Sequence, residues 1–386
     1  MLDVTHSDSR LEPHRALAFY LPQFHPIPEN DAFWGKGFTE WRNVVRAGPR
    51  FAGHEQPHLP ADLGFYDLRL AQTRAAQAEL ARRAGLSGFC WYHYWFSGRR
   101  VMSEPFEAML GDPSARFPFM LCWANENWTR AWDGGPREVL IRQDYCDADT
   151  RAHARALAPA LADPRHVRLD GRPLFAVYNA DELPDPRRWS DIFRETLLDL
   201  GIEVFLIRVE RHLDRDRRPP EALGFDAGLD FQPFSRRYSD WRGRPRALPL
   251  RALHRADRVL RRRFPRDSRP DMADYVDFDL ARPPVPYPLF PSVCPSWDNA
   301  ARRPQGQAIT FRNSAPDLFE RWTTARAAAL SSEAPILFVN AWNEWAEGNH
   351  LEPCLRHGHA WLDALRRGLD AVKSPGDGVV TSRAIG

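Results

Sequence analysis

Two glutamates three positions apart stand out as side chains that could do chemistry. Glu344 and Glu347 belong to the segment NEWAEG at 343–348, directly after the apolar run 336–341. Glycosyl chemistry needs one group to protonate the departing oxygen and a second to assist at the anomeric carbon. In apolar, aromatic surroundings the pKa values of two such carboxyls are pushed apart, and the more desolvated one is held protonated. We therefore predict a catalytic pair, with a capping or surface role as the ordinary alternative for a single Glu.

Aromatic and polar residues gather where the apolar runs end. Fourteen tryptophans are many for 386 residues, and most lie at these ends or in the segment 22–66. A sugar ring presents apolar C–H faces to aromatic side chains and a rim of hydroxyls to amides, carboxylates and imidazoles. Core packing is the alternative for any one Trp, and for His93 a satisfied core histidine is an equally open interpretation. The residues predicted to bind a glycan substrate are Tyr20, Gln23, Trp34, Trp41, His93, Tyr94, Trp123, Asn125, Glu126, Trp128, Tyr178, Trp297, Asp298, Trp342, Asn343 and Trp345.

Eight short apolar runs are the elements that must position these residues. Each is four to eight residues long, aromatic or β-branched, and shows little alternation, which is typical of a parallel strand buried on both faces. The runs are 17–21, 88–94, 118–123, 174–178, 204–209, 227–231, 289–294 and 336–341.

Segments with helical spacing lie between the runs, at 68–84, 150–161, 192–200, 318–330 and 360–372. Strands alternating with helices predict a parallel sheet, and a count of eight favours an α/β fold of the (β/α)₈ TIM barrel type. No glycine-rich nucleotide-binding motif follows a run, which removes a common reason for an open sheet. Long loops are expected after strands 1 and 6, at 22–66 and 233–287, on the face where barrels collect function.

Composition limits the partners and cofactors. A formal net charge of +2 requires no nucleic acid as partner. Five scattered cysteines without CxxC spacing argue against a disulfide framework and a zinc cluster, and no His, Asp or Glu group has metal-ligand spacing. We therefore predict neither a metal nor a cofactor.

Location and domain limits follow from the same survey. Residues 1–15 are polar, and no apolar run approaches the roughly 20 residues of a membrane span, so we expect a cytoplasmic protein. The expected organisation is an N-terminal extension at 1–15, a catalytic domain at 16–372 and a flexible tail at 373–386.

Two further patterns have competing interpretations. Asp277-Phe278-Asp279 is a literal DxD, which nucleotide-sugar transferases use to hold a divalent metal, but it does not follow an apolar strand. The Arg-rich stretches 236–246 and 258–269 could bind a diphosphate or an anionic membrane surface. For both stretches a solvated helical face is the favoured interpretation.

Five long motifs carry a resemblance to a known family. The segments AFYLPQFHPIPEN, FWGKGFTEW, GFCWYHYWF, CWANENWTRAWDG and AWNEWAEG resemble the WbsX-type family over about residues 16–372. Its members are labelled glycosyltransferases of O-antigen and capsule loci and carry a domain similar to glycoside hydrolase family 99. The resemblance implies a barrel and a metal-free retaining mechanism on α-mannoside-like substrates. It also implies that Glu344 is the base, which deprotonates the sugar's own 2-hydroxyl to give a 1,2-anhydro intermediate, and that Glu347 is the acid/base.

Three functional hypotheses remain open. The first is a glycosyltransferase of bacterial surface-polysaccharide metabolism that acts on manno- or rhamno-configured sugars. It would use an oligo- or polysaccharide with a lipid-linked or nucleotide-sugar donor, and could associate peripherally with a membrane. The second is an endo-acting hydrolase of the endo-α-mannosidase type. The third is a non-catalytic glycan-binding protein, in which the two glutamates point away from the cleft or form internal salt bridges.

Overall fold

Parallel strands form a barrel in the computed structural model, which describes residues 15–130, 138–244 and 266–372. Each of the eight predicted apolar runs becomes a strand position. Hydrogen-bonded neighbours follow one path, from β11 through β10, β9, β8, β4, β2, β1 and β13 to β12. The strands are β1 (Arg15–Tyr20), β2 (Gly88–Phe96), β4 (Phe119–Trp123), β8 (Arg172–Val177), β9 (Phe205–Glu210), β10 (Ala227–Asp230), β11 (Leu289–Phe290), β12 (Ser292–Val293) and β13 (Ile336–Val339).

The seventh strand position is split between β11 and β12. β11 pairs with β10, and β12 pairs with β13, while Pro291 alone separates them. Proline has no N–H to give to a ladder, so it interrupts the strand. Nine strands of the described chain therefore occupy eight positions, and the predicted (β/α)₈ barrel is confirmed.

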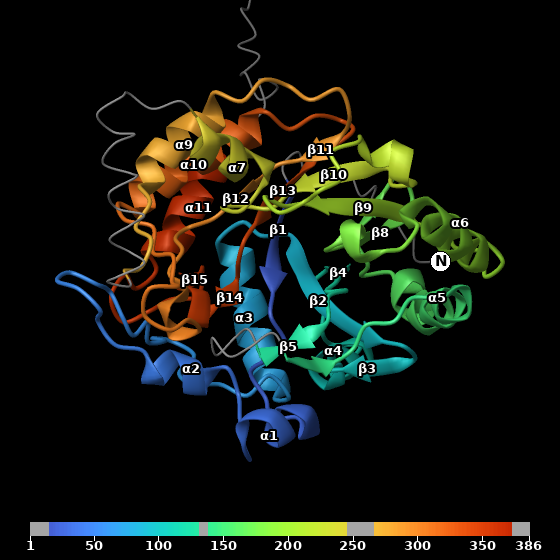
Figure 1. Cartoon of the computed structure of the whole chain (residues 1–386), viewed down its shortest axis with the longest axis horizontal. Coiled ribbons are helices and arrows are strands. Elements are labelled where there is room, and N and C mark those ends of the chain that lie inside the picture. Colours follow the sequence, from blue (N-terminus) through green and yellow to red (C-terminus); the bar gives the residue numbers. More distant parts are fainter. Residues whose placement is uncertain (1–14, 131–137, 245–265, 373–386) are drawn as a thin grey trace, which may run out of the picture.

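Helices cover the outside of the barrel, with α5 and α6 together on one side and α9, α10 and α11 on another (Figure 1). All five predicted helical segments are helices, although four of the five start at other residues than predicted. The sixth helix begins at Pro186, six residues before the predicted start, because the Asp185 side chain accepts a hydrogen bond from the Arg188 N–H and caps it. The outer helices are α3 (Ala71–Arg83), α4 (Glu104–Leu110), α5 (Asp147–Ala162), α6 (Pro186–Leu198), α10 (Pro316–Ala328) and α11 (Ala360–Asp370).

Long segments follow the first and sixth strands, as predicted, and each contains helices, of which only α7 is expected from the Arg-rich stretch 236–246. After β1 come α1 (Pro28–Trp34) and α2 (Trp41–Arg46); after β10 come α7 (Arg236–Gly243) and α9 (Met272–Leu280). Residues 245–265 of the second segment lie outside the described residues, as do 1–14 and the predicted tail. The proposed domain limits stay predictions. Short strands outside the barrel are β3 (Arg99–Val101), β5 (Trp128–Thr129), β6 (Val139–Ile141), β7 (Arg168–Leu169), β14 (Asn343–Glu344) and β15 (Asn349–His350).

The Arg-rich helix α7 is solvated only in part, because Arg242 is exposed whereas Arg236 and Arg237 are largely covered. The Arg236 side chain is only 12% exposed and pairs with Glu210 at 2.8 Å. The guanidinium of Arg237 lies 4.0 Å from the centre of the Phe278 ring. Arg236 therefore holds α7 against β9, and Arg237 holds it against α9.

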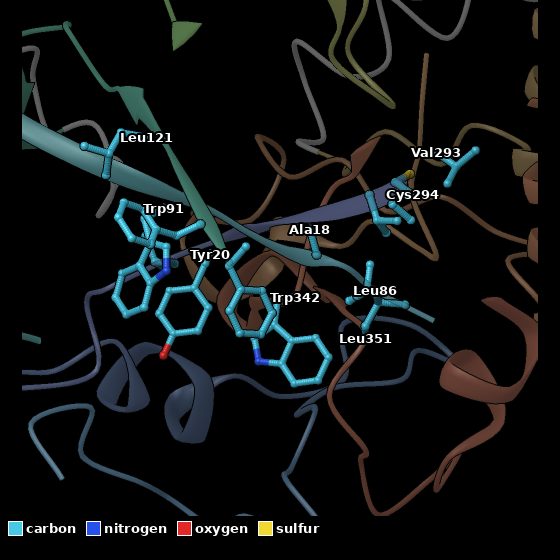
Figure 2. Packing of buried hydrophobic residues seen from close by; sticks show 14 of the residues in the cluster. Ala18, Tyr20, Leu86, Trp91, Leu121, Val293, Cys294, Trp342 and Leu351 are labelled. Carbon is cyan, nitrogen blue, oxygen red and sulfur yellow. The ribbon is translucent and has the colours of Figure 1, made fainter. Parts of the chain in front are cut away.

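Successive strand residues point alternately into the barrel and out toward the helices. Phe19 points inward, where its ring meets those of Phe231 and Phe338 from other strands. Tyr20 points outward, and Figure 2 shows it grouped with Trp91 and Trp342 in the layer between barrel and helices. Within the described residues, no helix is long and apolar enough to cross a membrane.

Candidate active site

A cavity of about 480 Å³ opens at the carboxyl end of the strands. Side chains that point inward along a strand also line this cavity where the strand ends. Alternate residues of one strand, such as Tyr92, Tyr94 and Phe96, therefore lie in its wall together. This is the end of a barrel where active sites lie. Its wall includes Leu21, Tyr92, Tyr94, Phe96, Glu126, Asn127, Trp128, Tyr178, Arg211, Phe231, Phe234, Trp297, Arg302, Arg303, Glu344 and Glu347.

The predicted catalytic pair lies in this wall, on a tight turn after β13. Glu344 ends β14, and Glu347 ends a short 3₁₀ helix that leads to Gly348. Gly348 has φ of +56°, and a Cβ there would lie 2.9 Å from the Cβ of Asp298. Only glycine fits both constraints, so the glycine that ends the NEWAEG segment keeps the turn that brings the two carboxyls together.

Asn343 fastens the start of this turn to the first strand. Its side-chain oxygen accepts a hydrogen bond from the Leu21 N–H at 2.7 Å, and its amide donates to the Leu21 carbonyl at 3.0 Å. The Asn343 amide thus forms the pair of hydrogen bonds with the Leu21 backbone that a neighbouring strand would otherwise form. Asn343 is fully buried and does not line the cavity, so its part is to position the glutamate that follows.

One arginine binds both glutamates. Arg302 donates from Nη2 to Oε2 of Glu344 at 2.9 Å, and its Nη1 lies 2.8 Å from Oε1 of Glu347. Its Nε donates to Oε1 of Glu40, from the segment after β1, at 2.7 Å. The two catalytic candidates therefore face one cavity and one cation.

Burial dominates the electrostatics of this group. It raises the pKa of Glu344 to about 8, with Arg302 opposing and the charges of Glu347 and Glu40 adding to the rise. Burial raises the pKa of Glu347 as well, again against Arg302. Burial disfavours the charged form of Arg302, but the three carboxylates outweigh it and raise its pKa well above the ordinary value. The pair therefore retains a proton near neutral pH, as acid/base chemistry requires.

Five of the predicted binding residues share the cavity with the glutamates: Tyr94, Glu126, Trp128, Tyr178 and Trp297. Tyr94 and Trp128 pack together, with ring centres 5.8 Å apart. Glu126 accepts a hydrogen bond from Arg211 at 2.7 Å, and the same guanidinium lies 4.7 Å from the centre of the Tyr178 ring. Aromatic faces and polar groups therefore meet in one wall, as a sugar ring requires.

Three predicted binding residues at strand ends point away from the cavity, because they occupy outward positions. The hydroxyl of Tyr20 donates to Gln77 on α3 at 2.6 Å. His93 meets His153 of α5 at 3.0 Å between the Nε2 atoms, and burial lowers the pKa of His93 to about 3. Trp123 packs on Trp189 of α6. The core interpretation therefore holds for Tyr20, His93 and Trp123.

Two tryptophans of the catalytic segment also lie behind the cavity. Trp342 is fully buried in the outer core, beside Tyr20 and Trp91 in Figure 2. Trp345 donates from its indole to Glu352 at 2.6 Å and stacks on His350. Both support the turn, and neither lines the cavity.

The remaining predicted binding residues lie one layer back from the cavity. Asn125 donates to the Asn179 carbonyl at 2.8 Å, and Trp41 donates to the Tyr66 carbonyl at 2.8 Å. Trp34 stacks on Phe38, and Gln23 is fully buried without lining the cavity. Asp298 accepts hydrogen bonds from Gln56 and Thr310 and lines a separate cavity. The residues predicted for binding that do not line the main cavity are thus Tyr20, Gln23, Trp34, Trp41, His93, Trp123, Asn125, Asp298, Trp342, Asn343 and Trp345.

Sequence reasoning missed several cavity residues. Tyr92 and Phe96 lie two positions on either side of Tyr94, so strand alternation would have found them once one inward residue was known. Arg211 continues the inward positions of β9 beyond its end. Arg302 lies in a short irregular segment and carried no motif signal, whereas its partner Glu40 lies in the motif FWGKGFTEW but was not singled out.

The DxD segment is not a metal site in this fold. Asp279 is buried in α9, where it pairs with Arg282 at 2.7 Å and with Arg326 at 2.5 Å. Asp277 pairs on the surface with Arg321. Two arginines already balance the buried carboxylate, and among the described residues no group of three His, Cys, Asp or Glu could hold a metal ion.

Comparison with known proteins places this barrel and its carboxylate pair in a family. The family model for "Glycosyltransferase WbsX" matches residues 16–365. The chain therefore belongs to the WbsX glycosyltransferase family, which confirms the resemblance seen in the five motifs.

Curated relatives and solved structures extend this placement. The chain is 41% identical over 365 residues to the uncharacterised protein WxcX of Xanthomonas campestris pv. campestris, covering 92% of this chain and 50% of the relative. It thus spans about half the length of that relative. A glycoside hydrolase-like protein superposes with a TM-score of 0.56 at 16% identity, covering 93% of this chain and 94% of the other. A GH99 endo-alpha-mannosidase from Bacteroides thetaiotaomicron superposes with a TM-score of 0.54 at 15% identity, covering 94% and 97%. At such identity these structures show the shared fold alone.

Proposed function

We propose that the chain is a glycan-active enzyme that makes or breaks a glycosidic bond by general acid/base catalysis. The observation that carries the proposal is the pair Glu344 and Glu347, which face one aromatic cavity and share the guanidinium of Arg302. Both carboxyls have raised pKa values, so one can give a proton while the other takes one. Membership of the WbsX family and the barrel shared with a GH99 endo-alpha-mannosidase support the same class of chemistry.

The proposed reaction follows from the two roles. Glu344 removes the proton of the sugar's 2-hydroxyl, and that oxygen forms a bond to the anomeric carbon. The glycosidic bond breaks as Glu347 protonates the departing oxygen. An incoming water or sugar hydroxyl then opens the 1,2-anhydro ring, losing its proton to Glu347 and returning the first proton from Glu344 to oxygen 2. This geometry suits a manno- or rhamno-configured sugar.

The pKa of Glu344 in the unliganded site bears on the proposed roles of Glu344 as base and Glu347 as acid. A pKa of about 8 means that Glu344 holds a proton at neutral pH before substrate enters. To act as the base it must release that proton, and the nearby cation of Arg302 favours the release by stabilising the carboxylate. Arg302 is therefore proposed to decide which of the two carboxyls is charged when the sugar arrives.

The roles can be separated by a change of leaving group. Glu344→Gln and Glu347→Gln should each abolish turnover of a natural glycoside, while circular dichroism remains that of the unaltered protein. A glycoside with a strongly activated leaving group needs no acid. It should restore turnover to Glu347→Gln and not to Glu344→Gln. Near-normal activity of either variant on the natural glycoside would contradict the proposal, and the reverse pattern of rescue would exchange the roles.

Transfer and hydrolysis are distinguished by the acceptor. The family description favours a glycosyltransferase, whereas the barrel shared with an endo-alpha-mannosidase favours a hydrolase. Incubating the protein with mannan or O-antigen fragments, and separately with sugar nucleotides or lipid-linked sugars plus acceptor, separates the two by product. The donor, a peripheral membrane association and a cytoplasmic location stay predictions.

A glycan-binding protein without catalysis is the second candidate. It has one observation in its favour, because both glutamates do form the internal salt bridges that it predicts, with Arg302. It fails to explain why both carboxyls line the cavity. The glutamine variants decide here as well. A binding protein would keep its glycan affinity in both variants and show no turnover in any of them or in the unaltered protein.

A further inference from the structure

A second cavity, of about 250 Å³, lies beside the catalytic one. It is lined by the segment 51–58 that follows α2, by the chain after β12, and by the segment that leads into α10. Trp297 lines both cavities, which makes its indole the common wall between them. Asp298, and Gly348 at the end of the turn that carries the two glutamates, line the second cavity and not the catalytic one.

Hydrogen bonds around Asp298 hold part of the wall of the second cavity in place. Asp298 is buried and accepts hydrogen bonds from Gln56 at 2.8 Å and Thr310 at 2.8 Å, and its Oδ2 lies 2.6 Å from Nε2 of His54. Its backbone N–H donates to the carbonyl of Glu347 at 2.6 Å. The side chains of this wall are therefore held in place, and one wall residue is joined directly to a catalytic candidate.

Two polar groups in this wall have no partner among the described residues, the hydroxyl of Ser314 and the indole nitrogen of Trp297. The hydroxyl of Ser314 is buried, lines the cavity and makes no hydrogen bond with any residue of the described chain. Buried hydroxyls are nearly always satisfied, so an orphan that faces a cavity indicates something that enters it. The wall of the cavity also includes Trp297, Phe311, Trp361 and His58.

We propose that the second cavity is a carbohydrate subsite that holds one further sugar unit of the glycan, apart from the bond that reacts. The Ser314 hydroxyl, the His58 imidazole and the Trp297 indole N–H suit the hydroxyl rim of a sugar, and the aromatic rings of the wall suit its C–H groups. The volume suits a single ring, below the range of pockets for larger ligands, which begins at about 300 Å³. The proposal rests on the proposed function for its ligand class, while its binding step needs no catalysis.

Direct binding tests the subsite. Mannose, rhamnose, glucose, galactose, glucuronate and N-acetylglucosamine are offered one at a time, and binding is followed by saturation-transfer NMR with the full chain. Ser314→Phe fills the second cavity, and Ala124→Trp fills the catalytic cavity, whose wall includes Ala124. Ser332→Phe adds the same bulk to an exposed turn and is the matched control.

At least one of these sugars should bind and should lose affinity about tenfold or more in Ser314→Phe, but not in Ala124→Trp or Ser332→Phe. Ser314→Ala, which cannot disturb the fold by bulk, should weaken the same sugar by a smaller factor. Binding lost only in Ala124→Trp, or no binding by any sugar, would overturn the subsite. These results do not depend on turnover, so a failure of Glu344→Gln to abolish activity would refute the proposed function and leave the subsite standing.

Discussion

The Nε of Arg302 lies 2.7 Å from Oε1 of Glu40, and this ion pair joins residues 262 positions apart. Both side chains are buried, at 7% and 0% exposure. Glu40 thus holds Arg302 in place, and Arg302 in turn binds Glu344 and Glu347. A buried ion pair of this kind fixes geometry more than it adds stability, because desolvation offsets much of the attraction.

Removal of the Glu40 charge should lower the pKa of Glu344. The negative charge of Glu40 contributes to the raised pKa of Glu344, so Glu40→Gln takes away one of the influences that favour the protonated form. Carbon-13 NMR of glutamate-labelled protein would follow the titration directly. Glu138→Gln, at an exposed ion pair with Arg130, is the control and should leave the titration unchanged. An upward shift in Glu40→Gln would show that Arg302 moves away once its anchor is lost.

Stability should fall with rising pH because of Glu344. Its folded pKa of about 8 lies above the ordinary 4.5, so the folded state binds the extra proton. The contribution is fully present below about pH 4.5 and is lost as pH rises through about 8, with a slope of up to about 1.4 kcal/mol per pH unit. Urea unfolding at several pH values would measure it.

The same measurement in Glu344→Gln should give a shallower slope. Glu352, whose pKa burial raises to about 7, lies outside the cavity and provides a comparison. Glu352→Gln should flatten the slope only below about pH 7, whereas Glu344→Gln should flatten it up to about pH 8. Identical slopes of stability against pH in all three proteins would contradict the raised pKa values of Glu344 and Glu352.

Gly348→Ala should destabilise the fold and disturb the site. The added Cβ would meet Asp298 at 2.9 Å, and φ of +56° is unfavourable for alanine. Gly171, with φ of +78° and nothing within 4 Å of a Cβ, isolates the conformational effect. We expect Gly171→Ala to cost about 1 kcal/mol and Gly348→Ala about 2 to 3 kcal/mol by urea unfolding. Equal costs would mean that Asp298 moves aside freely.

Two tyrosines at strand ends should respond in opposite ways to the loss of a hydroxyl. Tyr20→Phe leaves Oε1 of buried Gln77 without its donor and should cost about 1 to 2 kcal/mol of stability, with KM unchanged. Tyr178→Phe alters the cavity wall beside Arg211 and should raise KM with little change in unfolding. Activity assays and denaturation of both variants test the inward and outward assignment; a raised KM in Tyr20→Phe would reverse it.

The barrel could be predicted from sequence because its strands are continuous apolar runs between helical segments. All eight runs are strand positions, including 289–294, where Pro291 divides one position in two. The helices α1 and α2 were missed because their surroundings are rich in proline, glycine and aromatic residues, which resemble loops.

The site was predicted less completely than the fold, for the same physical reason. A strand buried on both faces shows no alternation, so nothing in the run 88–94 tells that Tyr94 points inward and His93 outward. The motif at 343–348 was found because its two carboxylates follow a strand. Arg302 was not found, because its importance arises from partners at Glu40, Glu344 and Glu347 that are remote in sequence.

The two hydrogen bonds between Asn343 and Leu21 limit the order in which parts of the protein can fold. Asn343 holds the turn of the catalytic candidates by binding the backbone of Leu21, which is 322 positions earlier. Protein synthesis delivers Leu21 before Asn343, with 322 positions between them. The growing chain can therefore fold its early strands before this turn is held in place, and the two candidate carboxylates are positioned only when Asn343 reaches the first strand.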